Sequence, residues 1–209
     1  MDNRLVHLAA DQTAVIGYGS LLSIESLSRT LKEPYTGPFL FCHLEGWRRS
    51  WDVSMPNEAF YFEENNERVY PGQIIYLNLR PAPRALLNCV LFVVRHDQLE
   101  AMHDREWIYD ATVVNDQLRG VQLQGGPALV YVAREENLAR DITSPRTGAI
   151  RRSYLEILES ALAVVDPVFR EEFERTTDPV PENLVIDDHL DPERPSPWAA
   201  AGKSYRPDA

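Results

Sequence analysis

The sequence predicts an α+β fold, a compact mixed β-sheet or β-barrel with flanking helices. Two observations lead to this prediction. Segments of strand-like composition follow one another along most of the chain without helices between them, which disfavours a parallel doubly wound sheet. Helical spacing is confined to short stretches near 24–32, near 97–106 and from 151 onward. The length of 209 residues suits a domain with a sizeable core.

The first half of the chain contains most of the expected strands. Residues 14–18 form an apolar stretch, AVIGY, that predicts a short buried strand ended by glycines. A helix is expected over 24–32, with Ser23 as its N-cap and Pro34 as its stop. Further strands are expected over 38–44, over 47–54, after the Pro71-Gly72 turn and over 87–94.

The second half alternates short elements. Asp97-Gln98-Leu99-Glu100 has the arrangement of a capping box and predicts a short helix. Strands are expected over 109–115 and in PALVYVA at 127–133, and a helix from 151 that Pro167 breaks. Residues 178–209 are rich in proline and acidic residues, so we expect an extended tail after a single domain over 1–177.

Composition restricts the kind of partner. The net charge of −11 disfavours nucleic acid, which requires a basic face. The one basic cluster, Arg146 with Arg151 and Arg152, is expected to be a solvated helix start. No apolar run approaches the roughly 20 residues of a membrane span, and the N-terminus lacks a signal sequence, so we expect no membrane partner and a cytoplasmic protein. Cys42 and Cys89 lie in apolar stretches and are expected to be buried free thiols.

The stretch GYGSL at 17–21 joins the first strand to the first helix. Such turns bind anions when bare backbone N–H groups face a ligand. The stretch is not a phosphate loop, because no Lys follows and neither GxGxxG nor GxxxxGK is present. Two interpretations remain open: a glycine turn that only packs Tyr18 in the core, or a turn that directs N–H groups at a small anion or a polarised carbonyl.

Glu106 is the second informative position. On a helix over 97–106 it falls on the same stripe as Leu99 and Met102, whereas Asp104 and Arg105 point elsewhere. A carboxylate on the apolar face has the raised pKa that suits a general base or a proton shuttle. The alternative is a Glu at a frayed helix end that reaches water or pairs with Arg105.

The same stretch allows a metal-site interpretation. His96-Asp97 and His103-Asp104 are His-Asp pairs seven residues apart, which could suggest a metal-dependent phosphohydrolase. Such sites need further ligands on neighbouring helices, and the remaining histidines lie in a lead-in, a strand and the tail. We therefore expect no metal site.

The ordered set of motifs resembles the gamma-glutamylcyclotransferase-like superfamily. GYGSL after an apolar strand, Pro-Gly at 71–72, VLFVV and a short helix ending in Glu106 carry this resemblance. REWIY at 105–109, ALVYVA at 128–133 and SYLEIL at 153–158 look most like its ChaC-type branch. The resemblance implies a compact mixed β-barrel with flanking helices.

The resemblance also implies an activity and a site. The activity is release of 5-oxoproline from a γ-glutamyl amide or peptide, glutathione among the candidate substrates, by attack of the α-amine on its own γ-carbonyl. Glu106 would be the general acid/base, with no cofactor or metal. The implied substrate-binding residues are Tyr18, Gly19, Ser20, Leu21, Tyr109 and Tyr154. The alternative is a non-catalytic domain of the same fold that binds a small ligand or a protein.

A group of aromatic residues is left undecided between a pocket wall and the core. Its members are Trp47, Trp51, Tyr61, Tyr76 and Tyr131.

Overall fold

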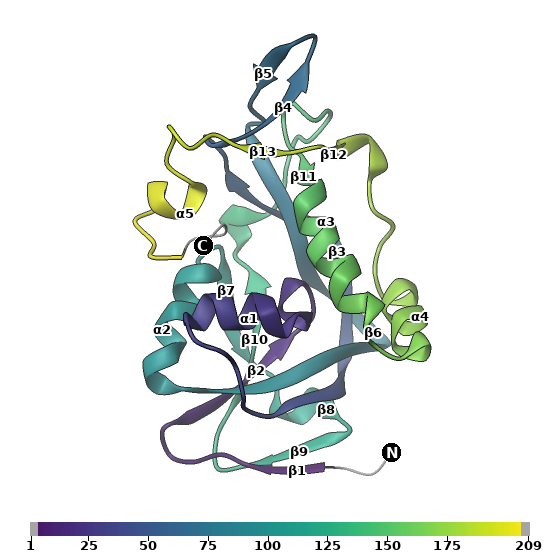
Figure 1. The fold of residues 1–209 in the computed structure, drawn as a ribbon. Coiled ribbons are helices and arrows are strands. Elements are labelled where there is room, and N and C mark those ends of the chain that lie inside the picture. The colour runs from purple at the N-terminus through teal and green to yellow at the C-terminus, as the bar shows by residue number, and fades with distance from the viewer. Residues whose placement is uncertain (1–3, 206–209) are drawn as a thin grey trace.

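A curved six-stranded sheet forms the centre of the computed structural model, which describes residues 4–205 (Figure 1). The strand order is β7-β10-β2-β6-β3-β8. The strands are β7 (Tyr109–Val113), β10 (Ala128–Ala133), β2 (Gln12–Gly17), β6 (Gln73–Arg95), β3 (Phe39–Pro56) and β8 (Leu118–Arg119). Neighbours are antiparallel except β10 and β2, which are parallel. The strands expected over 14–18, 109–115 and 127–133 are thus present.

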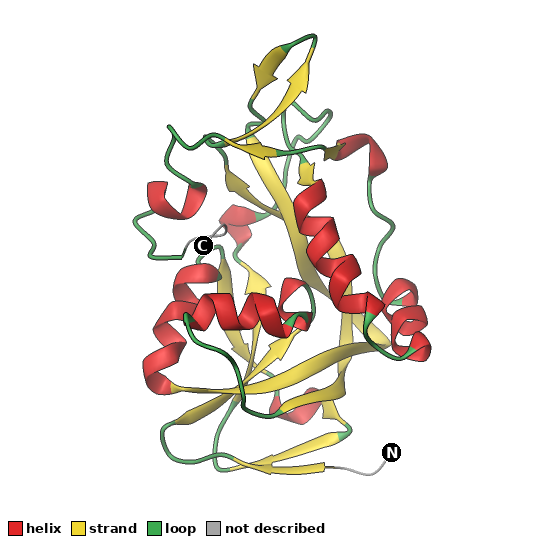
Figure 2. Ribbon diagram, in the orientation of Figure 1, coloured by secondary structure: helices red, strands yellow, loops and turns green. Residues whose placement is uncertain are grey.

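Smaller strand groups extend this sheet. They are β1 (Arg4–His7) with β9 (Val121–Gln124), β11 (Ile150–Arg151) with β12 (Val185–Ile186), and β13 (His189–Leu190) with β4 (Phe60–Glu64) and β5 (Glu67–Val69). The helices lie outside the sheet, as Figure 2 shows. They are α1 (Ile24–Leu31), α2 (His96–Arg105), α3 (Arg152–Ala163), α4 (Pro167–Arg175) and α5 (Pro197–Ala200).

Strands β3 and β6 are longer than the sequence predicts. The strands expected over 38–44 and 47–54 are one strand, β3, and the two expected between 73 and 94 are both part of β6. The ladder between β3 and β6 shifts register between Glu45 and Trp47, where Gly46 has a φ of +87°. A bulge bends a strand without ending it, so a glycine that suggests a turn in the sequence here allows the strand to continue.

The helix starts follow from local side chains. Ser23 Oγ accepts a hydrogen bond from Ser26 N at 3.1 Å, which confirms the expected N-cap of α1. The N-cap of helix α2 is Arg95, two residues before the expected cap Asp97, because β6 runs directly into the helix and Gln98 Oε1 accepts from Arg95 N. Helix α3 ends before Pro167, which starts α4 with Asp166 as its cap, as the proline predicts.

The C-terminal segment, residues 178–205, folds back onto the domain. The expectation of an extended tail is wrong for this part of the chain, because β13 pairs with β4 and Trp198 of α5 is only 5% exposed. Asp191, also buried, accepts a hydrogen bond from Tyr70 at 2.6 Å. A few anchoring residues thus attach a segment whose overall composition is that of a tail.

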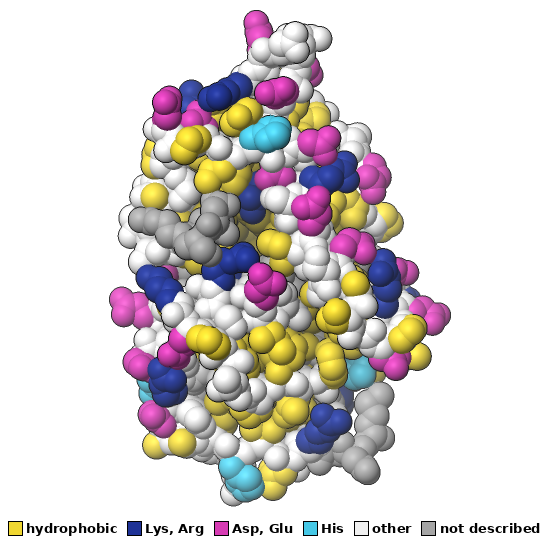
Figure 3. All heavy atoms as spheres, viewed as in Figure 1, with side chains coloured by type: hydrophobic (Ala, Val, Ile, Leu, Met, Phe, Trp, Pro, Cys, Tyr) yellow, Lys and Arg dark blue, Asp and Glu magenta, His cyan; other side chains and the backbone are white. Residues whose placement is uncertain are grey.

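The core is apolar and lies between the sheet and the helices. Its fully buried side chains include Ile16, Leu91 and Phe92 in the centre of the sheet. Cys42 and Cys89 are buried free thiols opposite each other on β3 and β6, as the sequence predicts. Acidic and basic side chains are interspersed over the face in Figure 3. None of the helices described within 4–205 has the length and apolar character needed to cross a membrane.

Candidate active site

The turn after β2 is tightly closed. A Cβ on Gly17 would lie 2.8 Å from the carbonyl oxygen of Leu21, and a Cβ on Gly19 would lie 3.1 Å from the hydroxyl oxygen of Tyr154. Both φ angles lie outside the left-handed region, so the two glycines are needed for close approach and not for an unusual backbone conformation. The turn continues as a short 3-10 helix over Ser20–Leu22.

Arg49 anchors the backbone of the turn through a hydrogen bond to Tyr18. This arginine is completely buried, and its Nε donates a hydrogen bond to the carbonyl of Tyr18. Its other nitrogens donate to Asn88 and Thr176. Burial lowers the pKa of Arg49 to about 9, so the guanidinium remains charged at neutral pH. The hydroxyl of Tyr18 donates to Tyr131 O at 2.8 Å, which fixes the same residue from its side chain.

These anchors leave the start of the 3-10 helix open. Within the described part of the chain, the backbone N–H groups of Gly19, Ser20 and Leu21 donate no hydrogen bond, whereas Leu22 N donates to Gly19 O at 2.9 Å. First-turn N–H groups of a helix have no partner inside the helix. They are therefore donors available to a ligand.

Glu106 is the C-cap of α2, one residue beyond the helix, with its N–H bonded to Met102 O. Its side chain is 14% exposed and forms an ion pair with Arg105, with 2.9 Å between Oε1 and Nε. Burial raises the pKa of the Glu106 carboxyl, and the neighbouring Arg105 opposes this rise. The carboxylate is therefore buried, as the first interpretation of the sequence expects, and it is also paired with Arg105, as the alternative expects.

Arg105 contradicts the expectation that it points away from the core. It is 7% exposed and connects α2 to the turn and to α1. It donates to Ser20 Oγ at 2.8 Å and to Ser26 Oγ at 3.0 Å, and also to Thr30. Helix α1 buries Ser26 and Thr30 one turn apart, so the face that packs against α2 offers acceptors to a guanidinium.

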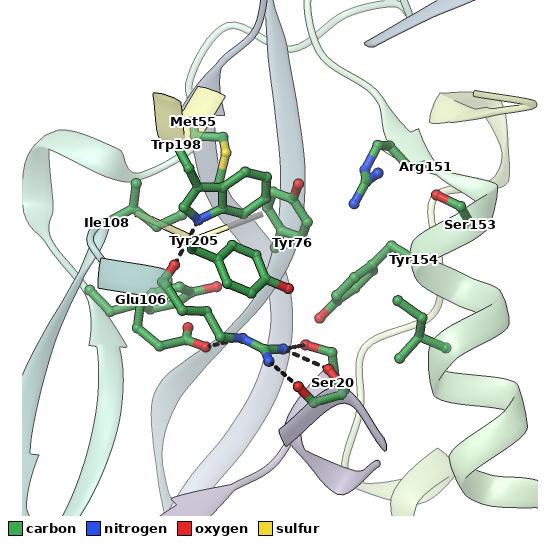
Figure 4. A pocket seen from close by; sticks show the side chains of 14 residues that line it. Ser20, Met55, Tyr76, Glu106, Ile108, Arg151, Ser153, Tyr154, Trp198 and Tyr205 are labelled. Carbon is green, nitrogen blue, oxygen red and sulfur yellow. Dashed lines mark hydrogen bonds and ion pairs between the residues drawn. The ribbon is translucent and has the colours of Figure 1, made fainter. Parts of the chain in front are cut away.

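A cavity of about 270 Å³ opens beside Glu106 (Figure 4). A smaller hollow adjoins it, and Ser20, Glu106, Tyr109 and Tyr154 line both. The smaller hollow is lined by every site residue expected from the sequence: Tyr18, Gly19, Ser20, Leu21, Glu106, Tyr109 and Tyr154. The structure therefore brings residues from distant parts of the chain into one place.

Tyrosines form much of the wall. The hydroxyl of Tyr109 donates to Leu77 O at 2.9 Å, and the ring of Tyr154 stands edge-on to Tyr76 with 4.9 Å between centroids. Burial raises the pKa of Tyr109 and of Tyr154, and the charge of Glu106 raises both further. Both hydroxyls are therefore protonated at neutral pH. Of the undecided aromatic residues, Tyr76 and Tyr131 line the hollows.

Several lining residues were missed by sequence reasoning. Trp198 and Tyr205 come from the segment expected to be a tail, and Trp198 Nε1 donates to Arg105 O at 2.9 Å. Arg151, expected at a solvated helix start, is 6% exposed and lines the cavity. No local sequence signal separates Arg151 from its exposed neighbour Arg152, because the difference arises from the packing of β11 against β12 and β6.

The residues of the metal-site interpretation do not converge. His103 Nδ1 lies 3.0 Å from the Tyr131 hydroxyl, and the backbone N–H of His96 donates to Asp11 O. Between residues 4 and 205, no group of at least three His, Cys, Asp or Glu side chains is placed to hold a metal ion.

Comparison with solved structures identifies the fold. A gamma-glutamyl cyclotransferase matches with a TM-score of 0.50 and 12% identity, over 84% of this chain and 94% of that chain. The chain has the gamma-glutamyl cyclotransferase fold. The uncharacterized human protein loc79017 matches with a TM-score of 0.51 and 12% identity, over 81% of this chain and 90% of that one. No family model and no curated protein matches the chain. These findings confirm the predicted fold class.

Proposed function

We propose that this protein is a gamma-glutamyl cyclotransferase that releases 5-oxoproline from a γ-glutamyl amide or peptide. One observation carries the proposal. The Glu106 side chain, which is only 14% exposed, lines the same hollow as the turn residues 18–21. A carboxylate and a turn whose N–H groups donate no hydrogen bond thus line the same hollow, in a fold shared with a gamma-glutamyl cyclotransferase.

The reaction needs a base, an anion site and a folded-back substrate. Glu106 takes a proton from the α-ammonium of the γ-glutamyl group, and the freed amine attacks its own γ-carbonyl carbon. The C–N bond to the leaving amine breaks as Glu106 returns the proton to that nitrogen. Glu106 then takes the second proton, which the attacking nitrogen loses as it becomes the lactam N–H, and passes it to the departing amine, which leaves as an ammonium. The products are 5-oxoproline and the free amine or peptide, and no covalent bond to the protein is required.

The residues around Glu106 have separate tasks in this proposal. The open N–H groups at 19–21 hold either the substrate α-carboxylate or the oxyanion that forms on the γ-carbonyl oxygen. Arg105 fixes the Glu106 carboxylate through its Nε and the turn through Ser20. Tyr109 and Tyr154 enclose the folded-back substrate and exclude water.

The experiment measures 5-oxoproline. Glutathione, γ-glutamyl dipeptides and γ-glutamylamines are offered to the wild type and to Glu106→Gln, which keeps the size and removes the base. We expect turnover of at least one substrate and a loss of about 100-fold or more in the variant, since a general base contributes about that much. Glu100→Gln, on the exposed face of the same helix, is the matched control and should retain full activity.

The ion pair at Glu106 favours a second candidate, a binding domain without catalysis. A carboxylate held by Arg105 at 2.9 Å is stabilised as an anion, and anions are weaker bases when so stabilised. In that case a γ-glutamyl compound would bind, measured by calorimetry, but no 5-oxoproline would form from any of the substrates.

A further inference from the structure

The cavity beside Glu106 has a second charged end. Arg151 and Ser153 line it on the side away from the Glu106, Arg105 and Ser20 group, with the rings of Tyr76 and Tyr154 between the two ends (Figure 4). Cyclisation uses only the γ-glutamyl part of the substrate, which the proposed function places at Glu106. In this proposal the leaving group therefore lies toward the other end of the cavity, which Arg151 and Ser153 line.

Arg151 is held rigidly at that end. Its guanidinium stacks over the Phe60 ring at 4.0 Å, and its Nη1 lies 3.5 Å from Asp188 Oδ2. Asp188 is oriented in turn by Ser153, whose N–H and hydroxyl both donate to it at 2.9 and 2.7 Å. A preorganised guanidinium binds a carboxylate with little loss of side-chain entropy.

The ion pair of Arg151 and Asp188 contributes only one of its two charges to the cavity wall. Among the described residues, Arg151 lines the cavity, whereas its carboxylate partner Asp188, whose side chain is buried, does not. The other carboxylate facing the cavity is Glu106, at the opposite end. The leaving-group end is thus lined by a cation and by aromatic rings, which suits an anionic group and disfavours a free ammonium.

We propose that Arg151 is the specificity-determining residue for the leaving group and selects γ-glutamyl amino acids or peptides, whose carboxylate it binds, over γ-glutamylamines. This inference rests on the proposed function and names its substrate class. A charge-assisted hydrogen bond to a carboxylate predicts a preference of about tenfold to a hundredfold over an uncharged analogue.

The test compares two substrates that differ in one group. γ-Glutamyl-alanine and γ-glutamyl-alanine amide are offered separately to the wild type, and kcat/KM is obtained from 5-oxoproline formation. The expected preference for the acid is about tenfold to a hundredfold. γ-Glutamyl-putrescine, whose leaving group carries a cation, should be turned over more slowly than either. This arm needs no variant and does not depend on the folding of a mutant.

Substitutions at Arg151 then test whether this residue causes the preference for the acid over the amide. Arg151→Met should reduce the acid-to-amide ratio to near one, and Arg151→Met with Asp188→Asn provides the same test without a buried unpaired carboxylate. Arg152→Met is the matched control, because Arg152 is adjacent and half-exposed and pairs with Asp187 outside the cavity. It should keep the wild-type ratio.

The outcomes separate the two proposals. Absence of 5-oxoproline from every substrate overturns the proposed function and this inference with it. Turnover of acid and amide at equal kcat/KM leaves the function standing and overturns the inference alone, because the cation at Arg151 would then not bind the leaving group. A wild-type preference that survives in the Arg151 variants also overturns it.

Discussion

Replacement of Gly17 or of Gly19 by alanine should have different consequences, although both residues lie in the same turn. In Gly17→Ala the new methyl carbon would meet backbone, at 2.8 Å from the carbonyl oxygen of Leu21, so the turn itself must shift. In Gly19→Ala it would meet the hydroxyl oxygen of Tyr154 at 3.1 Å, where the side chain must move by a few tenths of an ångström. The first change acts on the fold and the second on the site.

The magnitudes follow from these contacts. Overpacking against backbone costs about 1–3 kcal/mol, and each kcal/mol lowers Tm by about 2–4 °C in a chain of this size, so Gly17→Ala should lower Tm by roughly 2–12 °C. A misplacement of about 1 Å can cost about 100-fold in rate, so a shift of a few tenths at Tyr154 predicts a loss of roughly threefold to tenfold in kcat/KM for Gly19→Ala.

The assay pairs thermal unfolding with 5-oxoproline formation. Gly126→Ala is the control, because the nearest atom to its methyl would be the end of the flexible Leu8 side chain at 3.0 Å, the backbone oxygen of Gln12 would lie at an ordinary contact distance of 3.4 Å, and neither residue lines the cavity. We expect it to keep both Tm and rate close to those of the wild type. Full activity in Gly19→Ala, or an unchanged Tm in Gly17→Ala, would refute the reasoning from close approach.

Further predictions concern the groups that hold Glu106. Burial raises the pKa of Glu106 and the active form is the carboxylate, so the acid limb of the kcat/KM profile should lie above the ordinary Glu value of about 4.3. Arg105 lowers that pKa, so Arg105→Met should move the acid limb to higher pH and Arg105→Lys should move it less; an unmoved limb in Arg105→Met would contradict the ion pair. Trp198→Phe removes one buried hydrogen bond to Arg105 O, which should lower Tm by roughly 1–6 °C and reduce kcat; an unchanged kcat would show that the C-terminal segment does not position residues 105 and 106.

Much of the fold could be predicted because its signals are local. The cap at Ser23, the break at Pro167 and the alternation after Tyr109 each depend on a few neighbouring residues. The continuity of β3 through Gly46 could not be predicted, because a glycine gives the same local signal in a turn and in a bulge. Only the partner strand distinguishes the two.

The residues of the candidate site also differ in whether a local sequence signal could reveal them. The turn and Glu106 could be found from glycine spacing and from a carboxylate on an apolar stripe. Arg49, Arg151 and Trp198 could not, because each is buried by contacts with strands or segments far away in sequence. An arginine next to other charged residues reads as a surface residue until the acceptors that surround it are known.

The central claim is that Glu106 is the base that drives release of 5-oxoproline. The most direct measurement is the rate of 5-oxoproline formation from γ-glutamyl substrates by the wild type and by Glu106→Gln, with both proteins shown by circular dichroism to be folded. The account predicts turnover by the wild type and a loss of about 100-fold or more in the variant. Equal rates in the two proteins would contradict it.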